Sequence, residues 1–152
     1  MSVTYKNKLN YISSKYSHVN AFWMAQFSSL VYLDGGNNVP NVKEILSELK
    51  KADADFIDVH PFSAKSSEAV VINHKDYIVA SFRGTDEIAD WLDNINCVSV
   101  DGPLGRVHKG FWLALMDVWS DMKTCIRHCR LAANKDRAES DKLPDKPLWI
   151  TG

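Results

Sequence analysis

Three short runs of β-branched and aromatic residues in the middle of the chain constrain the fold class most strongly. They are DFIDV (55–59), AVVIN (69–73) and YIVASF (77–82), and residues of these types fit the pleated surface of a sheet. The polar HKD between the second and third runs predicts a tight hairpin connection. Because YIVASF is almost continuously apolar, it predicts a central strand that is covered on both faces.

Helical patterns lie on both sides of these strands. Residues 20–32 are rich in Ala, Phe and Met and predict a largely buried helix. Asn41 followed three residues later by Glu44 predicts a capping box at the start of a short amphipathic helix. Apolar residues recur at helical spacing from Phe111 to Ile126. Strands that alternate with helices in this way predict an α/β fold.

The end of the sequence, PLWITG (147–152), predicts a further strand that leads into a glycine. The residues before it, 133–147, are charged, poor in apolar side chains and interrupted by Pro144, which predicts a solvent loop. Since no internal repeat or interdomain linker is apparent, residues 1–152 are expected to belong to a single domain.

Composition and charge argue against several classes of protein. Hydrophobic residues make up 45% of the chain and the formal net charge is −1, so there is no electrostatic footprint for nucleic acid or an anionic membrane. The N-terminal MSVTYKNKLNYISS lacks the apolar region of a signal peptide, and no stretch approaches membrane-spanning length. These features predict a soluble, cytoplasmic protein.

The three cysteines, Cys97, Cys125 and Cys129, form no paired framework of the kind that staples secreted domains. Cys125 and Cys129 lie four residues apart with His128 between them, but no fourth residue with matching spacing completes a structural zinc set. Packing of two small sulfur side chains on one helix face is the favoured interpretation. No metal and no cofactor are therefore expected.

Four motifs follow one another along the chain: YSHVNAFWMAQFSSLVY, IVASFRGTDEIADWLDN, GRVHKGFWLAL and PLWITG. Together they resemble the class 3 lipases, the fungal-type triacylglycerol lipase family, over essentially the whole chain from about Tyr16. Several short motifs in the right order are more specific than any one of them. The resemblance implies the N-terminal part of an α/β-hydrolase domain, with a mostly parallel sheet and flanking helices.

The resemblance also implies where the chemistry lies. In this family the last strand feeds the strained G-x-S-x-G turn that carries the nucleophile, and Gly152 resembles its first glycine. The serine would follow two residues later, with the triad acid and histidine further downstream. The full-length protein is thus expected to hydrolyse carboxylic esters, most of all triacylglycerols, through an acyl-serine. The 152-residue chain alone is expected to be inactive.

One half of the oxyanion hole is implied at Thr85, which would supply a backbone N–H and a hydroxyl. Thr85 could instead only cap the helix that follows, because Thr is a good N-cap. Ile88, Trp91 and Leu92 stand where the family carries its lid, and their helical spacing fits an apolar flap at a lipid surface. The same spacing also fits an ordinary short amphipathic helix.

Three further residues receive structural roles near the implied acyl pocket. Arg83 is expected to form an ion pair or to anchor a carbonyl, with Asp90 or Asp93 as partner. Gly84 would let the backbone turn tightly as it leaves the strand. His108 is expected at a strand end, in a structural hydrogen bond beside the pocket.

Two kinds of protein are compatible with these features. The first is the ester hydrolase, with a lipid or other carboxylic ester as substrate and a lipid–water interface as its place of action. The second is a shortened, non-catalytic homologue that binds lipid or another protein. In both, the edge of the PLWIT strand and the apolar surface around Leu148 and Ile150 are expected to be exposed, which favours self-association or docking of a C-terminal half.

Overall fold

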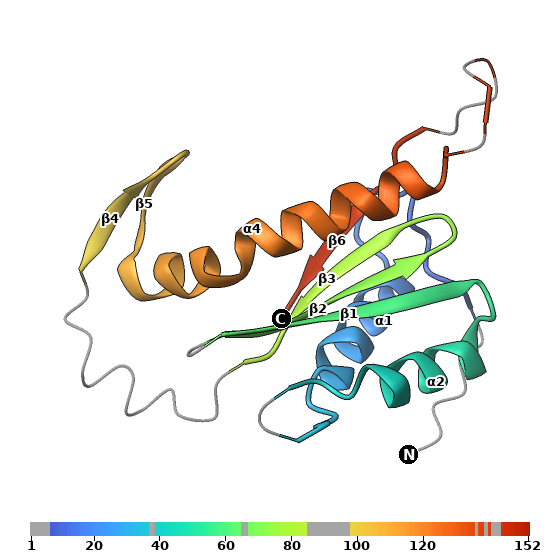
Figure 1. Ribbon diagram of the computed structural model, residues 1–152, viewed down its shortest axis with the longest axis horizontal. Coiled ribbons are helices and arrows are strands. Elements are labelled where there is room, and N and C mark those ends of the chain that lie inside the picture. Colours follow the sequence, from blue (N-terminus) through green and yellow to red (C-terminus); the bar gives the residue numbers. More distant parts are fainter. Residues whose placement is uncertain are drawn as a thin grey trace.

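The computed structural model describes residues 7–36, 39–64, 67–84, 98–135, 137–138, 140 and 144–152. Its helices are α1 (His18–Leu30), α2 (Val42–Ala52) and α4 (Lys109–Ala132). Its strands are β1 (Phe56–Ala64), β2 (Ser67–His74), β3 (Ile78–Phe82), β4 (Ser99–Gly102), β5 (Gly105–His108) and β6 (Leu148–Thr151). Figure 1 shows these elements arranged around one twisted sheet.

Four of the strands form a mixed sheet in the order β1-β2-β3-β6. β1 pairs antiparallel with β2, and β2 pairs antiparallel with β3. Only β3 and β6 run parallel. The expectation of a mostly parallel sheet is therefore wrong for the described strands, because two of the three strand pairs are antiparallel. β4 and β5 form a separate two-stranded sheet.

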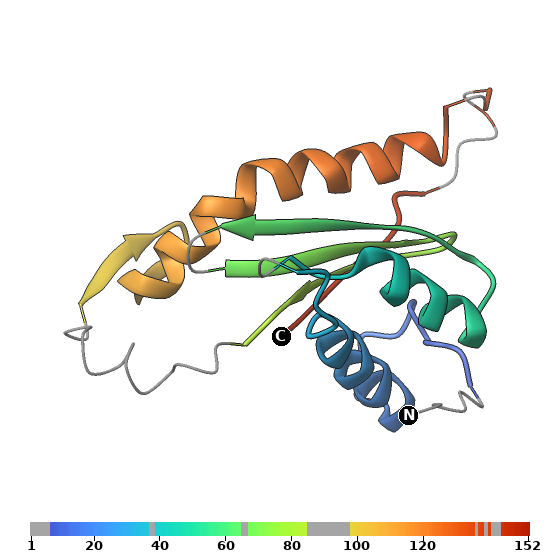
Figure 2. The same cartoon turned by 60° about the horizontal axis from the view of Figure 1, so that its bottom comes forward.

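The sheet is the middle of three layers, with α1 and α2 against one face and α4 against the other (Figure 2). Residues 69–74 of β2 and 78–81 of β3 are buried as a result. Both strands therefore have apolar side chains on both faces, and the prediction of a doubly covered strand at YIVASF is confirmed. The expected HKD hairpin is also present, closed by the His74 N–H donating to the Tyr77 carbonyl at 3.0 Å.

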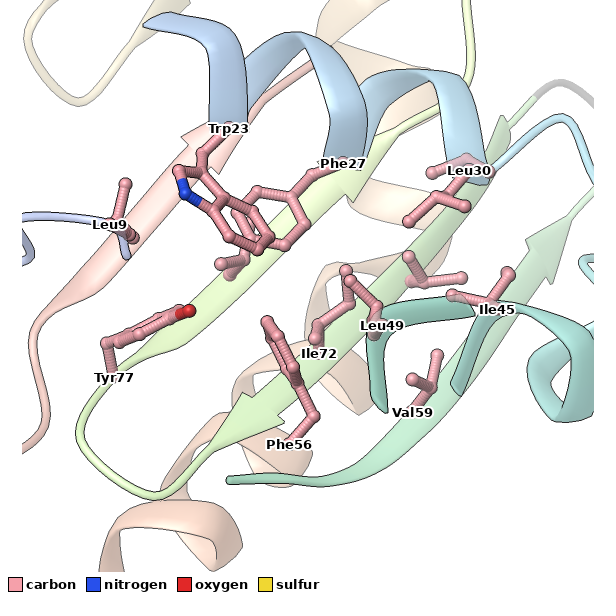
Figure 3. Packing of buried hydrophobic residues seen from close by; sticks show 13 residues of the cluster. Leu9, Trp23, Phe27, Leu30, Ile45, Leu49, Phe56, Val59, Ile72 and Tyr77 are labelled. Carbon is pink, nitrogen blue, oxygen red and sulfur yellow. The ribbon is translucent and has the colours of Figure 1, made fainter. Parts of the chain in front are cut away.

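The larger apolar cluster lies between the sheet and the two helices α1 and α2 (Figure 3). Trp23 and Phe27 from α1 are almost fully buried, and their ring centroids lie 5.3 Å apart. Phe56 from β1 completes the group, with its ring 6.1 Å from that of Trp23. Burying aromatic side chains of this size contributes roughly 1.5–3 kcal/mol each, so this cluster fixes α1 on the sheet.

Helix α2 begins as its sequence predicts. The Asn41 side chain accepts the Glu44 backbone N–H at 3.2 Å, and its amide donates to the Glu44 carboxylate at 3.0 Å. Ile45 and Leu49, one turn apart on the same face, are fully buried against the sheet. The capping-box prediction is therefore confirmed, with the Glu44 carboxylate meeting the side chain of the cap rather than its backbone.

The smaller cluster joins α4 to β2 and β3 through Val118, Met122, Ile126 and Cys129. The predicted apolar stripe of α4 extends further towards its N-terminus, but Phe111 is 69% exposed and Trp119 37% exposed. The first turns of α4 lie beside the β4–β5 hairpin instead of over the four-stranded sheet (Figure 1). The spacing thus predicts the helix correctly, and the structure buries only the later part of its apolar stripe.

The predicted solvent loop 133–147 ends earlier than its composition suggests. Lys146 is buried, and its ammonium donates to the Asn73 side chain at 2.9 Å and to the His74 carbonyl at 2.8 Å. Arg130 donates from Nε to the Lys146 carbonyl at 3.2 Å. These contacts hold the chain against the end of β2 immediately before β6 begins.

Candidate functional site

The carboxyl ends of β3 and β6 lie side by side at one end of the sheet. The register pairs Ser81 with Thr151, so the residues that follow, Phe82 and Gly152, also meet. A Cβ atom on Gly152 would lie 3.2 Å from the Phe82 Cβ and 3.3 Å from the Phe82 carbonyl oxygen. Contacts this short favour glycine here. In open α/β sheets, ligands bind outside the carboxyl ends of parallel strands.

Arg83 leaves β3 at this point and is held by Glu68 of the neighbouring strand β2. The guanidinium Nη1 lies 2.7 Å from Glu68 Oε2, and the Arg83 backbone N–H donates to the Glu68 carbonyl at 2.8 Å. The guanidinium also lies 5.1 Å from the ring centroid of Tyr32, within cation–π range. The structural ion pair expected of Arg83 is present with Glu68, while Asp90 and Asp93 lie outside the described residues.

Gly84 is fixed by a close approach of Tyr32. The Tyr32 hydroxyl donates to the Gly84 carbonyl at 3.2 Å, and a Cβ on Gly84 would come within 2.9 Å of the same hydroxyl oxygen. The positive-φ glycines of the described residues are Gly36 and Gly105, so Gly84 needs no left-handed backbone. Its small size serves the contact with Tyr32. The expected role in a tight turn stays a prediction, because the residues that follow Gly84 lie outside the described part of the chain.

Strand β6 is anchored to α1 through its last residue. The Ser28 and Thr151 hydroxyls lie 2.7 Å apart, and the Thr151 hydroxyl is 3.2 Å from the Met24 carbonyl. This pair of contacts sets the direction in which the chain emerges at Gly152. Trp149 packs on the α1 side of the sheet and Leu148 on the α4 side, while Ile150 is 65% exposed.

His108 ends β5 and directly precedes α4, in extended backbone geometry. Its imidazole lies 5.1 Å from the ring of Phe111 in a tilted arrangement. The structure thus places His108 at a strand end, as the family resemblance implies, and its structural hydrogen bond stays a prediction. The implied oxyanion donor Thr85 and the implied lid residues Ile88, Trp91 and Leu92 lie outside the described residues.

A second polar cluster lies at the far end of the sheet, around the buried His74. Its imidazole stacks on Tyr77 at 4.1 Å, and Nδ1 accepts the Asp76 N–H at 3.1 Å. Burial lowers the pKa of His74 below its usual 6.5, against the opposing effect of nearby carboxylates such as Asp53. The Lys8 ammonium lies 2.9 Å from the Asp53 carboxylate and balances its negative charge.

A third cluster, of one histidine and two cysteines, was not predicted from the sequence. His60 on β1 meets Cys125 and Cys129 on α4, with one possible ligand atom from each residue within 4.8 Å of the others. His128, which stands between the two cysteines in sequence, lines the adjacent cavity but does not belong to this trio. The signal available in the sequence was strand alternation, which puts His60 on the opposite face from Val59.

The comparisons with known proteins find similarity among solved structures only. No family model matches the chain, and no curated protein matches its sequence. Among solved structures, the chain is similar to Rhizomucor miehei triacylglyceride lipase, with 15% identity, a TM-score of 0.49, and coverage of 86% of this chain and 58% of the lipase. A deletion mutant of a Rhizomucor miehei lipase propeptide complex gives 16% identity, a TM-score of 0.49, and coverage of 97% and 48%.

The chain therefore spans about half the length of these two structures. Similarity at this level carries no inference about activity. The structure of the chain itself shows an α/β architecture, in which a mixed sheet carries helices on both faces. None of the helices in the described part of the chain is both long enough and apolar enough to cross a membrane.

Proposed function

We propose that the full-length protein is a serine carboxylic ester hydrolase of the triacylglycerol lipase type, and that this chain is the N-terminal part of its α/β-hydrolase domain. One observation carries the proposal: the segment that leaves β3 at Arg83 and Gly84 starts beside Gly152 at the end of β6. These are the two points from which an α/β-hydrolase builds its oxyanion loop and its nucleophile turn.

The residues at this end of the sheet suit the positioning of an oxyanion donor. Thr85 directly follows Gly84, whose carbonyl is held by Tyr32, and Arg83 is held by Glu68. Donors fixed before the reaction stabilise the charge that develops on the substrate carbonyl, and each contributes roughly 3–4 kcal/mol. In this proposal the serine beyond Gly152 attacks the ester, Thr85 donates to the oxyanion, and the alcohol leaves to give an acyl-serine.

The substrate class is proposed from apolar residues near this region. Ile88, Trp91 and Leu92 would form the lid over the acyl chain. Further apolar side chains are exposed on the segment before β4, the β4–β5 turn and the first half of α4, namely Val98, Leu104, Phe111, Leu113, Met116 and Trp119. A surface of this kind suits contact with a lipid–water interface, which favours acylglycerols over small polar esters.

The test compares the 152-residue chain with the full-length protein. The short chain should hydrolyse neither p-nitrophenyl butyrate nor p-nitrophenyl laurate above background, and a fluorophosphonate probe should not label it. The full-length protein should hydrolyse both esters and be labelled at the serine two positions after Gly152. Labelling of the short chain, or an active full-length protein whose labelled serine lies elsewhere, contradicts the proposal.

The exposed apolar residues also favour a second candidate, a non-catalytic module that binds lipid or another protein. The coding sequence distinguishes the two, because the hydrolase requires H-S-x-G or a related elbow directly after Gly152. A full-length protein that lacks this elbow, is not labelled by the probe, and co-sediments with triacylglycerol emulsions would support the module instead.

A further inference from the structure

A histidine and two cysteines meet on the α4 side of the sheet. Cys125 and Cys129 are four residues apart on α4, so their side chains share one face of the helix. His60 lies on the face of β1 that also carries Phe62, and Phe62 packs against the α4 cluster. β1 and β6 are opposite edges of the sheet, so this trio is separate from the strand ends at Gly152.

The spacing of the three side chains suits a small metal ion. One ligand atom from each residue lies within 4.8 Å of the other two. In a tetrahedral zinc site, bonds of about 2.3 Å to sulfur and about 2.0 Å to nitrogen place the ligand atoms about 3.5–3.8 Å apart. Small side-chain rotations would bring the trio from its present spacing to that geometry.

The surroundings supply two features that metal sites require. Asp58 accepts a hydrogen bond from His60 Nε2 at 2.9 Å, and a carboxylate in this position orients the ring and leaves the Nδ1 lone pair for a metal. A cavity of about 390 Å³ borders the trio, lined by Cys125, Cys129 and His60. It gives an ion access and leaves room for a water in a fourth coordination position.

The cysteine pair supplies ligand chemistry that suits Zn²⁺. Cysteine coordinates a metal as the thiolate, and thiolates are the soft ligands that Zn²⁺ binds in proteins. A metal that binds both sulfurs would displace their thiol protons and release them to solvent.

Two other interpretations fit less well. A disulfide needs Cβ atoms about 3.5–4.5 Å apart, whereas residues four apart on a helix have Cβ atoms about 5–6 Å apart. Asp53, Asp55 and His74 are the other group of possible ligands in the described residues. Both carboxylates of that group are already paired with the Lys8 ammonium, at 2.9 Å for Asp53 and 3.4 Å for Asp55. The trio of His60, Cys125 and Cys129 is therefore the better candidate for a metal site.

We propose that His60, Cys125 and Cys129 form a three-ligand site for Zn²⁺, with water from the cavity in the fourth position. Asp58 is the positioning residue of this site, because it holds the imidazole without touching the ion. The proposal is independent of the ester hydrolase function and stands or falls on metal binding alone.

Titration of the purified chain with Co²⁺, followed by displacement with Zn²⁺, tests the site. The chain should bind one Co²⁺ and show thiolate-to-metal charge-transfer absorption together with the strong visible bands of tetrahedral Co²⁺. Cys125→Ser, Cys129→Ser and His60→Gln should each lower the affinity at least about 100-fold, and Asp58→Asn about 10- to 100-fold. Cys97→Ser and His128→Gln are the matched controls and should bind as the unaltered chain does.

A second measurement needs no change in the trio. In the Cys97→Ser chain, one equivalent of Zn²⁺ should protect both remaining cysteines from alkylation, and mass spectrometry reads this directly. Circular dichroism shows whether each variant is folded. Absence of charge-transfer absorption in the folded chain, unchanged affinity in a folded Cys129→Ser or His60→Gln variant, or alkylation unaffected by Zn²⁺ would overturn the proposal.

Discussion

Replacing Met122 tests how α4 is held on the sheet. Met122 is fully buried among the β2 and β3 side chains, in a cluster with Val118 and Ile126. Met122→Ala removes the transfer free energy of the lost atoms and leaves a cavity, which together cost about 2–5 kcal/mol for a buried methionine. Alanine has only slightly higher helix propensity, so the gain in the helix is a few tenths of a kcal/mol at most.

Met116 on the same helix provides a matched control, because it is 36% exposed. Met116→Ala makes the same chemical change with little cavity, so it should lower the free energy of unfolding by less than about 1 kcal/mol. Domains of this kind are stable by about 5–15 kcal/mol, so the difference between the two variants is a large part of the total.

Urea unfolding, monitored by tryptophan fluorescence and circular dichroism, measures the free energy of unfolding of both variants. Repeating it at several protein concentrations accounts for association. The expected result is a lower urea midpoint for Met122→Ala. The shift in midpoint, multiplied by an unchanged slope of free energy against urea concentration, should correspond to a loss of at least about 2 kcal/mol in the free energy of unfolding. Equal midpoints for Met122→Ala and Met116→Ala would show that α4 does not pack on β2 and β3 as described.

Three further predictions concern the proposed site, acid stability and association. In the full-length enzyme, Thr85→Val should lower kcat about 10- to 1000-fold with KM little changed. Thr124→Val is the control and should leave kcat unchanged, because the Thr124 hydroxyl donates to a carbonyl within α4. Equal kcat values for the two variants in ester hydrolysis would show that Thr85 only caps a helix. Because burial lowers the folded pKa of His74 below 6.5, the unfolded chain binds its proton first as the pH falls. Stability should thus decline below pH 6.5 by up to about 1.4 kcal/mol per pH unit, and a folded His74→Asn chain whose urea midpoints decline equally steeply would refute this. The short chain should associate through the open edge of β6, so Ile150→Lys should reduce the particle mass measured by light scattering. Ile12→Lys is the control and should leave this mass unchanged, because Ile12 lies in a loop and is already 82% exposed. An unaltered chain that is monomeric would contradict the prediction.

Elements whose causes lie within a few residues were predictable from the sequence. The cap at Asn41 needs only Glu44 three residues away, and the HKD hairpin needs only the strands that it joins. The apolar run at YIVASF determined a strand with two buried faces, because it is almost continuously apolar and even the small Ser81 is buried. The strand before Gly152 was predictable for the same reason.

The candidate site was predictable only in part. Its location at the ends of YIVASF and PLWIT follows from the motifs, and the structure brings those ends together at Phe82 and Gly152. The partner of Arg83 was not predictable, because a long cation can reach many carboxylates, and only the β2–β3 register selects Glu68. Tyr32 at Gly84 likewise comes from 52 positions away.

The sequence by itself determined the helices α1, α2 and α4 and the strands of the four-stranded sheet, because hydrophobic periodicity and capping act over one or two turns. It did not predict the β4–β5 hairpin, which was expected to be a loop. The tertiary structure alone decided that β1 pairs antiparallel with β2, that the first turns of α4 leave Phe111 exposed, and that His60 meets Cys125 and Cys129. Periodicity shows that a face is apolar without showing what covers it. Contacts between distant segments depend on register and on the direction of chain connections, and these are set only when the layers pack together.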